Sequence, residues 1–190
     1  MRLLIRKPVW PLLIAFVLGV SLMRDTAESQ ISRRDSEALS QAQLIYIATV
    51  RKDGNQSTAA PVWFTTTPDG VVLIQTAPTS WKAKRIRRGS PVIVWIGRRD
   101  GVAFVGKAQI TSEPAIINRI VTDYPQKYFL ARLGLHRPSE EKFNQGQIVA
   151  IKIIPVRDLP EGFASAPGTP APNLNERASG SVASGQGEAR

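Results

Sequence analysis

Cysteine is absent from the 190-residue chain, and histidine occurs only once. Without cysteine the protein has no disulfide, no thiolate nucleophile and no cysteine-ligated zinc or iron–sulfur centre. The single histidine, His136, excludes metal sites built from several histidines. Any serine–histidine–aspartate mechanism would have to use this one residue. We therefore predict no bound metal, and no residue stands out as a catalytic acid or base.

Acidic residues are also scarce. The chain has 15 aspartates and glutamates against 25 lysines and arginines, which gives a net charge of +10. This balance favours an anionic partner, such as a phosphate-bearing cofactor, nucleic acid or an acidic membrane surface. Within residues 82–99 there are seven basic side chains and no acid. They are Lys82, Lys84, Arg85, Arg87, Arg88, Arg98 and Arg99.

No apolar run is long enough for a clear membrane span. The longest, Val9 to Met23, has 15 residues and follows Arg2, Arg6 and Lys7. As a helix it would cover about 22 Å, which is short of the ~30 Å hydrocarbon core. We predict that residues 1–23 are a signal peptide or a hydrophobic-helix membrane anchor, so the protein is membrane-anchored or exported to a periplasmic or extracellular space. Alternatively Met23 is the true start, and the protein is then cytoplasmic.

The other end of the chain lacks large apolar residues. From Ala164 onward the sequence is dominated by Ala, Ser, Gly and Pro, and Leu174 and Val182 are its only large aliphatic residues. Such a segment cannot bury enough apolar surface to offset chain entropy. We predict a linker over 24–35, one folded domain over 36–160 and a disordered tail over 161–190.

The folded segment has the texture of a small, mainly β protein. β-rich runs alternate with Gly, Pro, Asn and Asp turns at short spacing, which predicts an antiparallel six-stranded barrel with a few short helices. The predicted strands cover 44–50, 57–66, 71–76, 91–96, 102–110 and 147–154. The predicted helices cover 35–43, 80–88, 113–122 and 126–133. Pro61 predicts that its strand lies at an edge of the sheet or at a bulge.

The turn between the third strand and the basic helix is the most informative stretch. The strand ends at Thr76, and Ser80 is a good N-cap for the helix that follows. Lys82 lies in the first helical turn, where a lysine is unfavourable unless an anion is present. Hydroxyls, open backbone amides and a cation together predict a phosphate-binding turn. The alternative is a solvated basic helix face.

Several segments, taken in order, resemble the pyridoxamine 5′-phosphate oxidase-like family of flavin-binding split barrels. The resemblance covers about residues 36–157. The matching pieces are Ile47-Ala-Thr-Val-Arg-Lys-Asp-Gly54, Ala60-Pro-Val-Trp-Phe64, Thr76-x-x-x-Ser80-x-Lys82-Ala, Val105-Gly-Lys-Ala108 and Ile151-Lys-Ile-Ile-Pro-Val-Arg157. No single piece is specific, but their order and spacing match the family.

The resemblance implies a split barrel that forms a homodimer with FMN at the interface and acts as an oxidoreductase on a small molecule. A deazaflavin coenzyme is the alternative cofactor, because Lys82 to Arg88 resembles a basic run of deazaflavin-dependent members, and haem is a further one. The implied cofactor contacts are Pro61, Val62, Trp63, Phe64, Gln75, Thr76, Ser80, Trp81 and Lys82. The competing interpretations are a non-catalytic flavin- or haem-binding module and a basic barrel that binds nucleic acid or anionic lipid.

The sequence also departs from the family pattern. The true oxidase has arginines where Ala60 and Trp81 stand, and its C-terminal substrate-binding segment is missing here. These differences point away from the specific pyridoxamine phosphate oxidase activity. Among the other aromatic residues, we expect Trp95 to pack in the core and Trp81 to neighbour the cofactor. We expect His136 to lie on a surface loop.

Overall fold

The computed structural model describes residues 33–172. The predicted signal peptide or anchor at 1–23, most of the predicted linker and the tail beyond residue 172 lie outside the described residues. Described helices are α1 (Arg33–Gln41), α2 (Trp81–Arg87), α3 (Pro114–Lys127), α4 (Phe129–Arg132) and α5 (Glu140–Asn144). Described strands are β1 (Ile45–Thr49), β2 (Ala60–Val62), β3 (Thr65–Thr66), β4 (Val72–Thr76), β5 (Val92–Ile96), β6 (Ala103–Thr111) and β7 (Val149–Asp158). No described helix has both the length and the apolar character needed to cross a bilayer.

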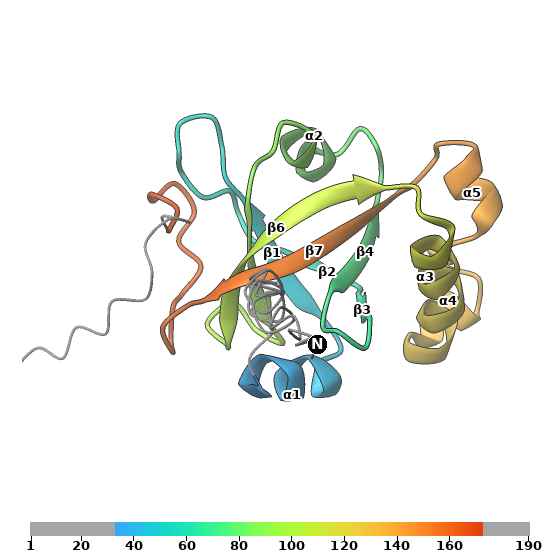
Figure 1. Cartoon of the computed structure of the whole chain (residues 1–190), viewed down its shortest axis with the longest axis horizontal. Helices are drawn as coiled ribbons and strands as arrows, with labels where there is room; N and C mark the ends of the chain where they lie inside the picture. Colours follow the sequence, from blue (N-terminus) through green and yellow to red (C-terminus); the bar gives the residue numbers. More distant parts are fainter. Residues whose placement is uncertain (1–32, 173–190) are drawn as a thin grey trace, which may run out of the picture.

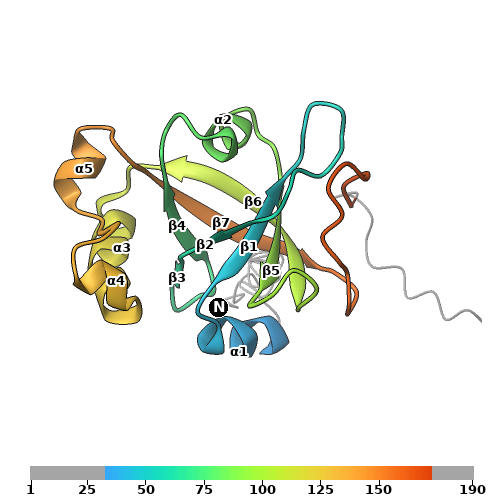
Figure 2. The same ribbon diagram turned by 180° about the vertical axis from the view of Figure 1, so that it is seen from behind.

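The strands form one curled sheet in the order β2-β1-β5-β6-β7-β4-β3, and every neighbouring pair is antiparallel. Figures 1 and 2 show the sheet bent round as a half-barrel. The predicted mainly β, antiparallel class is confirmed. The sheet has seven described strands where we predicted six, because the segment expected to be one strand over 57–66 is divided. β2 pairs with β1, whereas β3 pairs with β4 at the opposite edge of the sheet.

The break between these two strands lies at Trp63 and Phe64. It carries the chain from one edge of the curled sheet directly to the other, which brings the two edges together. Pro61 lies in β2, an edge strand, as the missing amide hydrogen of proline predicts. The side chain of Phe64 is buried in the core cluster. Its packing there accompanies the break in strand pairing at this point.

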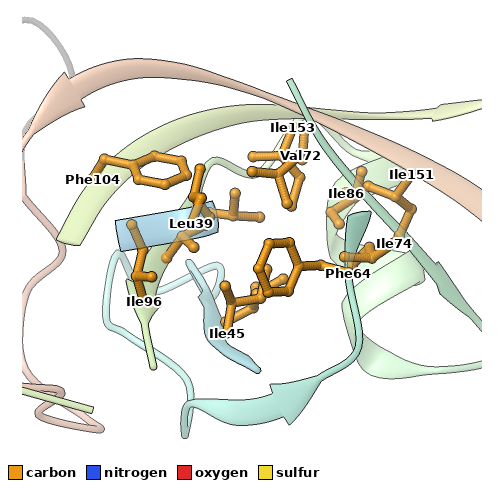
Figure 3. Close-up of a cluster of buried hydrophobic side chains, with 14 residues drawn as sticks. Leu39, Ile45, Phe64, Val72, Ile74, Ile86, Ile96, Phe104, Ile151 and Ile153 are labelled. Atoms are coloured by element: carbon orange, nitrogen blue, oxygen red, sulfur yellow. The ribbon is translucent and has the colours of Figure 1, made fainter. Parts of the chain in front are cut away.

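The barrel interior is an apolar cluster of buried residues (Figure 3). Every strand contributes to it except β2 and β3, the strands at the two edges of the sheet. Leu39 of α1 and Ile86 of α2 join this cluster from the two helices. At Gly106 of β6 the register with β7 shifts, and an added Cβ there would lie 2.5 Å from Cγ2 of Ile153. Only glycine fits this close approach of strand and side chain.

The predicted helices correspond to α1 to α4. Helix α2 is followed by Gly89 at φ +84°, a left-handed conformation that favours glycine after the end of a helix. Helix α3 continues to Lys127, five residues beyond our prediction, and α4 is shorter than predicted because Tyr128 is extended between the two. Helix α5 was not predicted. It starts at a Ser139 N-cap whose side chain accepts a hydrogen bond from the amide of Lys142.

The outer faces of the sheet are covered by two different segments. Helices α3 and α4 bury Ile120, Tyr124 and Ala131 against Leu73 of β4 and Ala150 of β7. On the other side, the segment after β7 packs against β1, β5 and β6.

That second cover comes from residues 159–172, most of which we had assigned to the tail. Leu159, Phe163 and Ala171 join the outer cluster around Trp95. The indole Nε1 of Trp95 donates to the carbonyl oxygen of Phe163 at 2.6 Å, and the amide of Gln56 donates to the carbonyl of Thr169 at 2.8 Å. The first part of the predicted tail, residues 161–172, is therefore a layer of the fold. Trp95 is fully buried, which confirms its expected role in packing.

Candidate functional site

The turn from β4 to α2 has the N-cap that its sequence predicts. The Oγ of Ser80 accepts a hydrogen bond from the amide of Ala83 at 3.1 Å. It also accepts one from the hydroxyl of Thr76 at 3.2 Å. Because both of these bonds use the oxygen as acceptor, the hydroxyl proton of Ser80 is left to donate. The strand end and the helix start are thus tied together by two of the predicted site residues.

Lys82 projects from the first turn of α2 into a partly buried position. Burial lowers the pKa of its amine from 10.5 to about 8, because a low-dielectric surrounding disfavours the charged form. No ion pair joins this amine to a carboxylate of the described residues. The site therefore holds a desolvated amine that no carboxylate of residues 33–172 neutralises.

The amine belongs to a pocket of about 260 Å³ between β1 and α2, which we call the basic pocket. Three cations and three hydroxyl side chains line it, and no carboxylate does. The lining residues are Ile47, Thr49, Arg51, Ser57, Thr58, Ala60, Trp81, Lys82 and Arg85. Such a set, with many donors and no carboxylate, is suited to an anion carrying several oxygens.

Arg85 is fixed in the basic pocket by β1. Its guanidinium donates to the hydroxyl oxygen of Thr49 at 3.0 Å, and Thr49 in turn contacts the hydroxyl of Ser57 at 3.2 Å. Burial lowers the pKa of Arg85, and the neighbouring charges of Arg51 and Arg88 lower it further. Clustered like charges of this kind are relieved when an anion binds between them.

The sequence did not identify the β1 side of this pocket. Thr49, Arg51 and Ser57 lie some thirty residues before α2 in the sequence, and only the folded barrel places them beside Lys82 and Arg85. The signal that existed was the acid-free basic run at 82–99, which located the α2 half. The β1 half carries no motif of its own.

Trp81 stands at the mouth of the basic pocket with 70% of its surface exposed. The amine of Lys84 lies 5.0 Å from the centroid of its ring, and the guanidinium carbon of Arg85 lies 5.6 Å from it. The exposed ring therefore has two cations over it, next to the pocket.

Gln75 and Thr76 line a different pocket of about 460 Å³, which we call the strand-end cavity. His136, Arg137 and Lys142, from α5 and the loop before it, form its far wall. The side-chain nitrogen Nε2 of Gln75 donates to the backbone carbonyl of His136 at 3.1 Å. The side-chain oxygen of Gln75 is buried and has no hydrogen-bond partner among the described residues. An unpaired buried acceptor of this kind is unfavourable, and a donor that reached it would satisfy it.

The remaining predicted contacts lie in β2, at Pro61 and Val62, and directly after it, at Trp63 and Phe64. Pro61 is exposed and Val62 half-buried on the edge strand. Trp63 stacks on Tyr128, with ring centroids 4.5 Å apart and planes 5° apart, and its carbonyl accepts a hydrogen bond from the hydroxyl of Tyr124. Burial raises the pKa of Tyr128 to about 12 and that of Tyr124 well above its usual value, so both phenols are protonated donors.

Phe64 is fully buried, and its backbone is already engaged. Its amide donates to the hydroxyl of Tyr128 at 2.7 Å, and the same hydroxyl donates to its carbonyl at 2.8 Å. The amine of Lys127 lies 3.4 Å from the centroid of the Phe64 ring. Both backbone polar groups of Phe64 are thus used by the protein itself.

His136 lies on an exposed loop, as its composition predicted, with a positive φ of 53°. Its ring centroid is 6.3 Å from that of Trp63, in an edge-on arrangement. Eight of the nine predicted residues therefore form three neighbouring groups. Trp81 and Lys82 are in the basic pocket, Gln75 and Thr76 line the strand-end cavity, and Pro61 to Phe64 lie in and directly after β2. The ninth residue, Ser80, caps α2 and lines neither pocket.

Comparison with known proteins gives one family match. The family model described as pyridoxamine 5′-phosphate oxidase matches residues 32–159. A search of the curated proteins finds no match.

Solved structures resemble the chain at low sequence identity. A conserved hypothetical protein from Mycobacterium tuberculosis is 21% identical, with 67% of this chain and 82% of that chain covered and a TM-score of 0.49. A candidate pyridoxamine 5′-phosphate oxidase from Listeria innocua is 20% identical, with 66% and 94% covered and a TM-score of 0.49. The general stress protein 26 from Bacillus anthracis is 23% identical, with 64% and 85% covered and a TM-score of 0.47.

Proposed function

Because the chain belongs to the pyridoxamine 5′-phosphate oxidase family, we propose that its barrel binds a flavin-type cofactor and acts as an oxidoreductase on a small molecule. FMN is the proposed cofactor, and a deazaflavin coenzyme is the alternative. Both carry phosphate next to a tricyclic ring system. The proposal therefore requires an anion site beside a surface that accepts a flat ring.

The observation that carries this proposal is the basic pocket. A buried amine without a counter-ion is costly, and the lowered pKa of Lys82 reflects that cost. A phosphate placed between Lys82, Arg85 and Arg51 would supply the missing negative charge. The residues present therefore fit a phosphate group, although Ala60 and Trp81 provide no charge where the true oxidase has arginines.

Four side chains in or next to the pocket have proposed tasks in binding. Lys82 and Arg85 neutralise the phosphate, and Arg85 is already oriented by its hydrogen bond to Thr49. The Ser80 hydroxyl donates a further hydrogen bond, while its oxygen keeps α2 capped. Trp81 shields the polar part of the cofactor at the pocket mouth. When bound, a flavin-type ring supplies hydride or electron transfer, and the protein orients it and excludes water.

We propose that the ring system contacts the edge strand at Pro61 and Val62 and the strand end at Gln75 and Thr76. The orphan side-chain oxygen of Gln75 is suited to an N–H donor of the ring or the substrate. Trp63 and Phe64 have a supporting task in this proposal. Their backbone groups are held by Tyr124 and Tyr128, which fixes the strand that edges the ring.

We further propose that the protein is a homodimer with the cofactor at the interface. Within one chain the predicted contacts are divided between two pockets and an exposed edge strand. A second copy would enclose a ligand that extends along this surface. Light scattering on the purified protein measures the mass, and a monomer with a bound cofactor would contradict this part of the proposal.

The experiment that tests the function starts with what co-purifies with the full chain. We expect a yellow protein whose released ligand has the mass and absorbance of FMN or of a deazaflavin coenzyme. A colourless protein that binds neither compound would overturn the proposal. A haem spectrum would instead support the alternative of a haem-binding module.

A second measurement separates an enzyme from a binding module. The bound cofactor is reduced, and its reoxidation is followed with a panel of small acceptors against the same cofactor free in solution. We expect at least one acceptor to react faster with the protein-bound form. If every acceptor reacts more slowly than with the free cofactor, the protein stores or senses the cofactor without turning over.

A further inference from the structure

The α4 region has an exposed apolar surface that the proposed cofactor site does not use. It consists of Phe129, Leu130, Leu133 and Leu135, which expose 65%, 47%, 62% and 55% of their area. Only two other large hydrophobic residues of the described chain are exposed, Trp81 and Val156. Four large apolar side chains within seven residues form a patch that a soluble surface rarely carries without a binding role. We call it the apolar surface.

Local packing holds these side chains outward. Tyr128 and Ala131 are the buried residues of this segment and face the cluster shared with α3 and β4. The amide of Leu133 donates to the carbonyl of Phe129, and the amide of Leu135 donates to that of Leu130. The apolar surface is therefore a fixed part of the fold. Figures 1 and 2 show α4 at the margin of the molecule.

The charges around the apolar surface are basic. Residues 124–138 include Lys127, Arg132 and Arg137 and no acidic residue. Arg132 and Arg137 are exposed, while Lys127 is half-buried over the Phe64 ring. On the helices packed beside it, Asp123 of α3 is paired with Arg119, and α5 begins with Glu140 and Glu141. Apolar side chains rimmed by arginines match the interface of an anionic bilayer.

The apolar surface lies close to the start of the described chain, which agrees with a bilayer as its partner. Gln43 and Leu44, which follow α1, share a pocket of about 340 Å³ with Phe129 and Leu130. Figures 1 and 2 show α1 below the sheet and α4 at its side, both in the lower half of the view. Nine residues, 24–32, separate α1 from the apolar run that we predict to be an anchor. Nine residues span at most about 30 Å, so the domain is held near any membrane that the run enters.

We propose that the apolar surface docks the barrel onto an anionic lipid bilayer, with its four apolar side chains in the interfacial layer and the arginines at the lipid phosphates. The basic pocket lies between β1 and α2, and in Figure 1 α2 lies above the sheet, opposite α1, while α4 lies at the side. None of the four apolar side chains lines the basic pocket, so docking through α4 leaves that pocket accessible from the aqueous side. This inference does not depend on the proposed oxidoreductase activity.

Because the chain has no cysteine, a single introduced cysteine can be labelled without a background. We would attach an environment-sensitive fluorophore to Leu133→Cys and, as a matched control, to Val156→Cys on β7, which is 48% exposed. The full chain is reconstituted with vesicles of phosphatidylcholine, with or without phosphatidylglycerol. Circular dichroism checks that each labelled variant is folded.

We expect a blue shift of the probe at position 133 with the phosphatidylglycerol vesicles, a smaller shift with phosphatidylcholine alone and no shift at position 156. Arg132→Glu combined with Arg137→Glu should reduce the shift at position 133. An unchanged emission at position 133 on vesicles that carry the protein would overturn the proposal. A blue shift without vesicles that grows with protein concentration would also overturn it, because the occupant is then a second copy of the chain.

Discussion

The hydroxyl of Tyr128 lies 2.7 Å from the amide nitrogen of Phe64 and 2.8 Å from its carbonyl oxygen. One side chain between α3 and α4 thus satisfies both polar groups of the residue at which the chain crosses from β2 to β3. Since Phe64 is fully buried, water cannot replace these bonds.

Replacing Tyr128 by Phe should therefore destabilise the barrel. Two buried backbone groups lose their partner, and leaving such groups unpaired costs about 1–3 kcal/mol each. Urea unfolding followed by circular dichroism measures the change in the free energy of unfolding. Tyr46→Phe is the matched control, because Tyr46 lies in β1 with Arg99 over its ring, away from this crossing. Equal midpoints for the two variants would contradict the assigned role of Tyr128.

Lys82→Ala should weaken binding of the cofactor. The lost interaction is a charge-assisted hydrogen bond in a partly buried pocket, which is worth about 1.5–3 kcal/mol, or roughly a tenfold to hundredfold increase in the dissociation constant. Fluorescence titration with FMN gives that constant. Lys84→Ala removes the same charge from the exposed side of the same helix and should change affinity far less. If both variants bind equally well, the buried amine is not part of the site.

The affinity should also depend on pH through Lys82. Its pKa in the ligand-free protein is about 8, and a bound phosphate would raise that pKa by stabilising the charged amine. Above pH 8 the amine of Lys82 is then protonated in the complex but deprotonated in the free protein, so binding must take up a proton. The dissociation constant should accordingly be steady from about pH 7 and rise as the pH passes about 8. Lys82→Ala should abolish this rise, and a profile that stays the same in the variant would assign the rise to another group.

Gly106→Ala should destabilise the contact between β6 and β7. The new Cβ would lie 2.5 Å from Cγ2 of Ile153 and 3.3 Å from the carbonyl oxygen of Ile154, so one strand must move. Overpacking of this kind costs about 1–3 kcal/mol. Thermal unfolding measures the loss. Gln109→Ala, at an exposed position of the same strand, controls for the strand itself, and an equal effect of both substitutions would contradict the close packing.

Ending the chain after residue 160 should destabilise the protein, whereas ending it after residue 172 should not. The shorter form loses Phe163, whose carbonyl accepts the bond from Trp95 and whose ring stacks at 6.2 Å from it. Exposing this apolar face costs about 2 kcal/mol or more. Urea unfolding of the two truncated forms against the full chain tests the difference. Equal stability of all three would mean that the segment contributes nothing to the fold.

Local patterns predicted most of the barrel. β-branched runs bounded by Gly, Pro, Asn and Asp turns located the strands, and the helix expected over 80–88 from its N-cap Ser80 agrees with α2 within a residue at each end. What the patterns could not predict was the break at Trp63 and Phe64. Nothing local to that apolar segment marks it. The break results from Phe64 packing in the interior and from Tyr128, which lies 64 residues later in the sequence.

The segment after β7 was misjudged for a related reason. Its composition is poor in large apolar residues, but Phe163 and Ala171 are enough, because the sheet already offers Trp95 as a partner. Likewise the α2 half of the basic pocket was visible as a charge run, while Thr49 and Arg51 acquired a role only through folding. Long-range pairing, which no window of sequence contains, decides these cases.

Pro61 has a consequence for how the protein behaves among other proteins. Neither β2 nor β3 has a second neighbouring strand among the described residues, so each leaves one side of its backbone unpaired. Unpaired strand edges of this kind are templates on which strands of other proteins aggregate. Proline presents no N–H there, and a β-ladder cannot be extended past it. The edge of β2, which we propose contacts a flat ligand, therefore cannot pair fully with a strand of another protein.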